Sequence, residues 1–202
     1  VIQLELIVTA SGSTILSYVA LTVYSQMMST ETRPGPDPKE AIDRFLKDLD
    51  QLVSSSPDSQ LSDNITEYLK QHSTDLPWHE LEPNIGDRGE MGRYGRLQLG
   101  VGESTGLELV LAHVPPKSEG RIERHGHCGW AVVLVLRGTE VNELFEADSN
   151  GKMQCVSTQT FGAGEVAILA PEAIHSIYSP EGSVSLHVYD RAQAPECGAK
   201  VR

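Results

Sequence analysis

Arg124-His125-Gly126-His127-Cys128-Gly129-Trp130-Ala131-Val132-Val133-Leu134-Val135-Leu136-Arg137-Gly138 is a stretch that begins with imidazoles and continues as an apolar segment ended by glycine. The aliphatic, partly β-branched residues 131–136 predict a buried β-strand. Side chains alternate between the two faces of a strand, so His125 and His127 point the same way. Two imidazoles on one face can hold a metal ion if a further ligand lies nearby. The alternative is that they are ordinary polar residues at a strand end.

Short apolar segments continue on both sides of this stretch, separated by glycine, proline and asparagine turns. The expected strands are 96–99, 107–114, 131–136, 141–145, 166–169, 174–178 and 184–189. The strand at 131–136 is expected to stop at Gly138, with 141–145 as its hairpin partner, and Ser149-Asn150-Gly151 is a strong turn signal. Many short strands at regular spacing predict a mainly β sandwich or barrel. With histidines pointing inward, we expect a small jelly-roll barrel that holds a metal at its mouth.

A third histidine, His175, follows a turn signal at Pro171 and lies in another predicted strand. The order His-x-His, a hairpin and then Pro-x-x-x-His resembles the ligand order of cupin barrels. His125, His127 and His175 are therefore expected to form a set of three neutral imidazole ligands. Several divalent metals accept imidazole, so the ligands alone do not identify the ion.

Ser185, His187 and Tyr189 alternate along the last predicted strand, so all three side chains face one side of it. A hydroxyl, an imidazole and a phenol in a row can form one hydrogen-bonded chain that orients the phenol. The alternative is the ordinary polar face of an outer strand.

Two helices are expected ahead of the strands. Asp37-Pro38 is typical of a helix start, with aspartate as the cap and proline at the first helical position. Apolar residues then recur at helical spacing. We expect a single domain over residues 37–202, with helices at about 38–72 packed on a barrel at about 94–192.

Residues 1–36 are expected to be an N-terminal extension, non-native or disordered. Residues 7–26 carry no charge and are long enough to span a bilayer. They are also rich in serine and threonine, and Glu5 precedes them where a signal peptide carries positive charge. The preferred interpretation is sequence upstream of a natural start at Met27 or Met28. The alternative is a membrane-associating segment.

The composition is that of an ordinary soluble domain, with 202 residues, 39% hydrophobic and 22% charged. A formal net charge of −12 argues against a nucleic-acid or anionic-membrane surface. Cys128, Cys155 and Cys197 show no paired spacing, so we expect free thiols in a cytoplasmic protein. No long amphipathic stripe is left over, and a monomer is expected.

The separate motifs together resemble one family. They are Tyr94-x-Arg96, His125-x-His127, Leu136-Arg137-Gly138, His175 and Ser185-x-His187-x-Tyr189. In this order they make residues 94–197 resemble the thiol dioxygenases, the cysteine dioxygenase family of the cupin superfamily. The resemblance implies a double-stranded β-helix with one non-haem Fe(II), held by the three histidines. It also implies that Arg96 binds the substrate carboxylate, that Tyr94 and Trp130 contribute to substrate binding, and that the serine, histidine and tyrosine form the supporting triad.

The chain departs from the family at several positions. Ala131 stands where mammalian-type members carry a cysteine, so no crosslink to Tyr189 is expected. Gly126 stands where an aspartate is usual, and no carboxylate follows His127 within four residues. Trp130 followed by a small residue resembles the bacterial branch, which includes 3-mercaptopropionate dioxygenases.

The expected activity is addition of O2 to a small carboxylate-bearing thiol, with cysteine as first choice. The alternatives are 3-mercaptopropionate or another thiol, a cupin enzyme with a different reaction, and a non-catalytic cupin that binds a small ligand.

Overall fold

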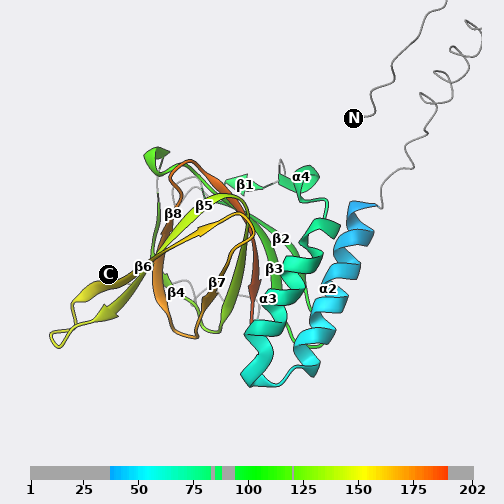
Figure 1. Ribbon diagram of the computed structural model, residues 1–202, viewed down its shortest axis with the longest axis horizontal. Coiled ribbons are helices and arrows are strands. Elements are labelled where there is room, and N and C mark those ends of the chain that lie inside the picture. Colours follow the sequence, from blue (N-terminus) through cyan, green and yellow to red (C-terminus); the bar gives the residue numbers. More distant parts are fainter. Residues whose placement is uncertain (1–36, 83–84, 88–93, 120, 191–202) are drawn as a thin grey trace, which may run out of the picture. The chain divides into compact units, whose positions relative to one another are not determined.

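The computed structural model describes residues 37–82, 85–87, 94–119 and 121–190 (Figure 1). The expected N-terminal extension at 1–36, with its uncharged segment, lies outside these residues, as do Cys197 and the expected end of the barrel at 192. Within the described ranges, no helix is long and apolar enough to cross a membrane.

The N-terminal helices are α2 (Pro38–Ser55) and α3 (Leu61–His72). α2 starts where proline and its cap predict, since the Asp37 side chain accepts a hydrogen bond of 2.9 Å from the Lys39 amide. Three short helical turns accompany them: η1 (Asp58–Gln60), η2 (Ser73–Asp75) and α4 (Trp78–Leu81). Both long helices pack their apolar faces on the sheet, with Phe45, Leu49, Ile65 and Leu69 buried in the contact.

The rest of the described chain is β-structure with one further helical turn, η4 (Lys117–Glu119). The strands are β1 (Gly86–Asp87), β2 (Gly95–Val101), β3 (Glu108–Val114), β4 (Ile122–Gly126), β5 (Ala131–Ala147), β6 (Met153–Gly162), β7 (Val166–Leu169), β8 (Ile174–Tyr178) and β9 (Ser183–Tyr189). Their hydrogen-bonded order is β1-β2-β3-β9-β5-β8-β4, with β6 and β7 also paired to β5, and every pairing is antiparallel. The sheet curls around an interior (Figure 1), which confirms the expected mainly β fold with N-terminal helices packed on it.

One expectation about the strands is wrong. Residues 131–136 and 141–145 are not two strands of a hairpin, because β5 continues through Gly138 for 17 residues. Its first half pairs with β7 and β9, and its second half pairs with β6 and β8. Gly138 has a φ of +81°, and a Cβ there would collide with the Gly182 carbonyl. The glycine therefore bends the strand from one sheet into the next and does not end it.

β9 is buried at all seven positions, so both of its faces are covered. Val184, Leu186 and Val188 face the helices, and Leu186 and Val188 pack in the same core as α2 and α3. The alternate residues Ser183, Ser185, His187 and Tyr189 then face the interior. The polar row predicted from the sequence is therefore not the solvent face of an outer strand.

α2 is joined to the β2–β3 turn by one buried carboxylate. Asp50 accepts hydrogen bonds from the Ser104 amide at 2.8 Å, the Thr105 amide at 3.0 Å and the Thr105 hydroxyl at 2.5 Å. Burial raises the pKa of Asp50, but the hydrogen bonds from Thr105 and Ser104 outweigh it and hold the pKa below its ordinary value.

Replacing Asp50 with asparagine should lower the free energy of unfolding by about 1–3 kcal/mol at neutral pH, because one amide donor then faces an NH2 group. The lowered pKa of Asp50 means that the stabilisation is present above the unfolded-state pKa. It is lost as the pH falls through the folded-state pKa, so the gap between wild type and Asp50→Asn should close in acid. Urea unfolding at several pH values measures this, with exposed Asp48→Asn as the matched control. A gap that stays constant into acid would contradict it.

Candidate metal centre

The register of β4 against β8 places His125 directly opposite His175. His127 follows two residues later on the same side of the chain, just beyond the end of β4. The ring nitrogens of the three histidines that could act as ligands all lie within 4.8 Å of one another. Nε2 of His127 and Nε2 of His175 are 2.9 Å apart. His127 and His175 are buried and His125 is half-buried, so the cluster lies at the edge of the interior.

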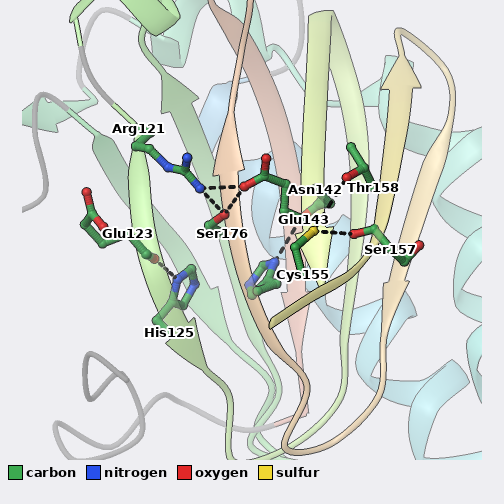
Figure 2. Close-up of polar contacts among 10 residues, drawn as sticks. Arg121, Glu123, His125, Asn142, Glu143, Cys155, Ser157, Thr158 and Ser176 are labelled. Carbon is green, nitrogen blue, oxygen red and sulfur yellow. Dashed lines mark hydrogen bonds and ion pairs between the residues drawn. The ribbon is translucent and has the colours of Figure 1, made fainter. Parts of the chain in front are cut away.

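The outer nitrogens of two of these rings are fixed by oxygen acceptors. Nδ1 of His125 is 2.8 Å from the Glu123 carbonyl (Figure 2), and Nδ1 of His175 is 2.9 Å from the Asn142 side-chain oxygen. An oxygen acceptor requires a proton on Nδ1, so in a neutral ring the lone pair lies on Nε2, which faces the cluster. Burial lowers the pKa of His175 well below its ordinary value. Burial also lowers the pKa of His125, and the hydrogen bond to the Glu123 carbonyl, which raises this pKa, is the weaker effect. Three imidazoles with converging ring nitrogens, two of them driven toward the neutral form by burial, are a donor set that fits a divalent metal ion.

An ion-pair network holds the strands that carry two of these ligands. Arg121 donates to Glu143 at 2.6 Å and to Ser176 at 2.5 Å, and Ser176 donates to Glu143 at 3.1 Å (Figure 2). Burial raises the pKa of Glu143, but the bonds from Arg121 and Ser176 outweigh it and keep the pKa low. The network ties β5 and β8 to Arg121, the residue just before β4, and lies next to His175.

The three polar residues predicted on β9 form the expected chain. Ser185 Oγ is 2.8 Å from His187 Nε2, and His187 Nδ1 is 2.9 Å from the Tyr189 hydroxyl. Burial, followed by the nearby Arg96 cation, lowers the pKa of His187 to about 3. Burial, followed by the neighbouring Tyr94, raises the pKa of Tyr189 well above its ordinary value. The histidine is therefore neutral and the phenol protonated at neutral pH, and the Tyr189 ring centroid lies 5.3 Å from that of His127.

Arg96 lies beside this tyrosine, with its guanidinium carbon 5.3 Å from the Tyr189 ring centroid. Its Nη2 donates to Glu108 at 2.6 Å, and Glu108 is directly opposite Tyr189 in the register of β3 and β9. The residue expected to bind a substrate carboxylate thus already has a carboxylate partner from its own chain. Sequence analysis missed Glu108, although a charged residue at the start of an apolar strand was visible.

The remaining two predicted residues differ in their placement. Tyr94 is buried and close enough to Tyr189 to affect its pKa. Trp130 packs against the core beneath α2 and α3, whereas Ala131 on the opposite face of the chain lies in the cluster with Tyr189. Eight of the nine predicted side chains therefore share the interior, Trp130 being the exception, and the role of each residue in binding or catalysis stays a prediction.

Two further residues escaped the sequence analysis. Asn142 orients His175, and Glu140 is fully buried two positions before it on β5. Their spacing of two along one strand was the signal.

The expectation of three free thiols is wrong for Cys128, which is disulfide-bonded, while Cys155 is an exposed free cysteine. Sequence spacing does not reveal pairing between segments that meet only in the fold.

The chain was compared with known proteins. No protein-family model and no curated protein sequence matches it. Solved structures do match, and several are cupins. A cupin-like protein from Thermotoga maritima is 17% identical, with 52% of this chain and 77% of that one covered and a TM-score of 0.41. A cupin-2 domain protein from Shewanella frigidimarina is 14% identical, and the match covers 60% of this chain and 99% of that one with a TM-score of 0.43. Oxalate decarboxylase from Lactobacillus farciminis, in a formate complex, is 19% identical, and the match covers 55% of this chain and 32% of that one with a TM-score of 0.41.

Asn142→Leu should weaken divalent-metal affinity about 10–100-fold, because His175 loses the acceptor that fixes its tautomer. Asn142→Asp is the matched control, since it keeps an acceptor oxygen at that position. Competition with a chromophoric chelator measures both affinities. Equal affinities of the leucine and aspartate variants would show that the acceptor has no such role.

Proposed function

We propose that this protein is a non-haem Fe(II) thiol dioxygenase that converts a small carboxylate-bearing thiol, with cysteine as first choice, to its sulfinate. The observation that carries the proposal is the combination of side chains in one interior. Three histidines converge there, beside a buried serine–histidine–tyrosine chain and an arginine. The resemblance of these motifs to the thiol dioxygenases supports the same conclusion.

The overall reaction balances without an outside reductant, because R–SH and O2 combine to R–SO2H. When bound to the three histidines, Fe(II) would supply a Lewis acid for the thiolate and an electron donor for O2.

Arg96 binds the substrate carboxylate through its planar, five-donor guanidinium, which can serve Glu108 and a second carboxylate together. Glu108 then offers an acceptor to a substrate ammonium beside that carboxylate. This paired arrangement suits an amino-acid thiol better than a thiol with a carboxylate alone, and it favours cysteine over 3-mercaptopropionate. Arg96 and Glu108 form a charge-assisted pair with 2.6 Å between Nη2 and Oε2.

Tyr189 keeps its proton at neutral pH and donates a hydrogen bond to a ligand beside the histidines. His187 and Ser185 hold the phenol in one orientation through bonds of 2.9 and 2.8 Å. The shell of buried strands around them excludes water from the reacting thiol.

A second candidate is a cupin enzyme acting on a small carboxylate that carries no thiol. Arg96 would bind such a substrate equally well, and the same histidines accept several divalent metals. The expected monomeric state belongs to the proposal as well, and so does the cytoplasmic location, although the disulfide at Cys128 is unusual for a reducing compartment.

Protein loaded with Fe(II) should consume O2 when given cysteine, and more slowly with 3-mercaptopropionate, cysteamine or mercaptosuccinate. His175→Ala should abolish the uptake, because the metal loses one of its three ligands. An oxygen electrode, with iron content measured in parallel, provides the readout. Iron-loaded protein that consumes no O2 with any of these thiols would contradict the proposal and favour the second candidate.

Glu108→Gln should raise KM for cysteine about tenfold, because the cysteine ammonium loses its carboxylate partner. KM for 3-mercaptopropionate should stay equal or fall, because Arg96 no longer pairs with a carboxylate of its own chain. Steady-state kinetics with both thiols measure the selectivity. Glu103→Gln, an exposed glutamate in the preceding turn, is the control. An unchanged preference between the two thiols would remove Glu108 from substrate recognition.

A further inference from the structure

Glu140 is the one fully buried carboxylate whose burial the site described above does not explain, within the part of the chain that the structure covers. It lies on β5 just beyond Gly138, where this strand passes from one sheet to the other, and its exposed fraction is 0%. No lysine, arginine or histidine forms a salt bridge with it in the described ranges. A buried carboxylate without a counter-ion is very costly, whereas a neutral carboxylic acid is not.

The two oxygens of Glu140 have different surroundings. The Ser183 hydroxyl donates to Oε1 at 2.9 Å, which suits a carbonyl oxygen. Oε2 is buried and has no hydrogen-bond partner among the described residues. If the proton of the neutral acid lies on Oε2, this O–H group needs an acceptor. Burial raises the pKa of Glu140, while the hydroxyls of Ser185 and Ser183 act in the opposite direction. Ser185 is therefore the neighbour that such an O–H group can reach.

Ser185 is also the first member of the chain that leads to Tyr189. Its hydroxyl lies 2.8 Å from His187 Nε2, and His187 Nδ1 lies 2.9 Å from the tyrosine hydroxyl. All of these groups are buried, so no water competes for their hydrogen bonds. A neutral imidazole has one donor nitrogen and one acceptor nitrogen, so the chain can run in only two directions.

We propose that Glu140 is a positioning residue that sets the direction of this hydrogen-bonded chain, so that the Tyr189 phenol donates to a ligand beside the three histidines. The proposal rests on the proposed function for its purpose, but its geometry is independent of the metal. As a neutral acid, Glu140 donates to Ser185, the Ser185 hydroxyl donates to His187 Nε2, and His187 Nδ1–H donates to Tyr189. The phenol proton then points away from His187, where Tyr94 is a hydrogen-bond neighbour and a ligand can also accept it.

The opposite direction removes that donor. A carboxylate at position 140 would accept from Ser185, Nε2–H of His187 would donate to the serine, and the phenol would donate to Nδ1. Tyr189 could then only accept from a ligand. The position of the single proton on His187 therefore reports the direction of the whole chain.

The test is the tautomer of His187, measured by long-range 1H–15N NMR on the full chain without added metal and assigned with His187→Asn. Wild type should carry the proton on Nδ1. Glu140→Gln should keep this tautomer, because its amide can still donate to Ser185 and accept from Ser183. Glu140→Met should shift the population toward Nε2–H. Ser185→Ala, which cuts the same link with a smaller change of volume, should do likewise and guards against a methionine variant that does not fold.

Activity gives a second, separable readout. In Fe(II)-loaded protein, Glu140→Met should lower kcat about tenfold with KM little changed, whereas Glu140→Gln should restore kcat. If no thiol is oxidised by wild type, the proposed function fails while the tautomer result still stands. If wild type, Glu140→Met and Ser185→Ala all show one His187 tautomer, or if wild type carries the proton on Nε2, the role of Glu140 is refuted whatever the activity.

Discussion

The passage of β5 from one sheet to the other is the constraint on which the interior depends. Gly138 makes it possible, because only a residue without Cβ fits against the Gly182 carbonyl with a φ of +81°. Before Gly138 the strand pairs with β9, and beyond it the strand pairs with β8. One continuous backbone thus places the Ser185–His187–Tyr189 chain and the ligand His175 on two sides of the same interior.

That interior is polar but carries little net charge. Burial drives His125, His175 and His187 toward the neutral form, and Arg96 is paired with Glu108. Such a lining costs less to bury than separate charges would, provided that each polar atom has a partner. A dipositive ion among neutral ligands would keep its full charge, which is the condition for strong binding of a thiolate.

Much of this was predictable because it follows from alternation along single strands. His125 with His127, and Ser185 with His187 and Tyr189, share faces for that reason alone. Asn142, Glu108 and Glu140 were missed because their partners lie on other strands, and pairing across a curled sheet is set by register, which local pattern does not contain. The role of Gly138 was missed for a related reason. A glycine after an apolar run suggests the end of a strand, but here the strand continues, and the glycine is required because the backbone passes close to Gly182. The same limit hid the disulfide at Cys128.

The central claim is that the three-histidine cluster supports the addition of both oxygen atoms of O2 to a thiol. Mass spectrometry of the product formed from cysteine under 18O2 by the iron-loaded protein tests it most directly. The account predicts cysteine sulfinate that carries two 18O atoms, and none of this product from His175→Ala. Cystine as the only product, or sulfinate labelled from water, would contradict it.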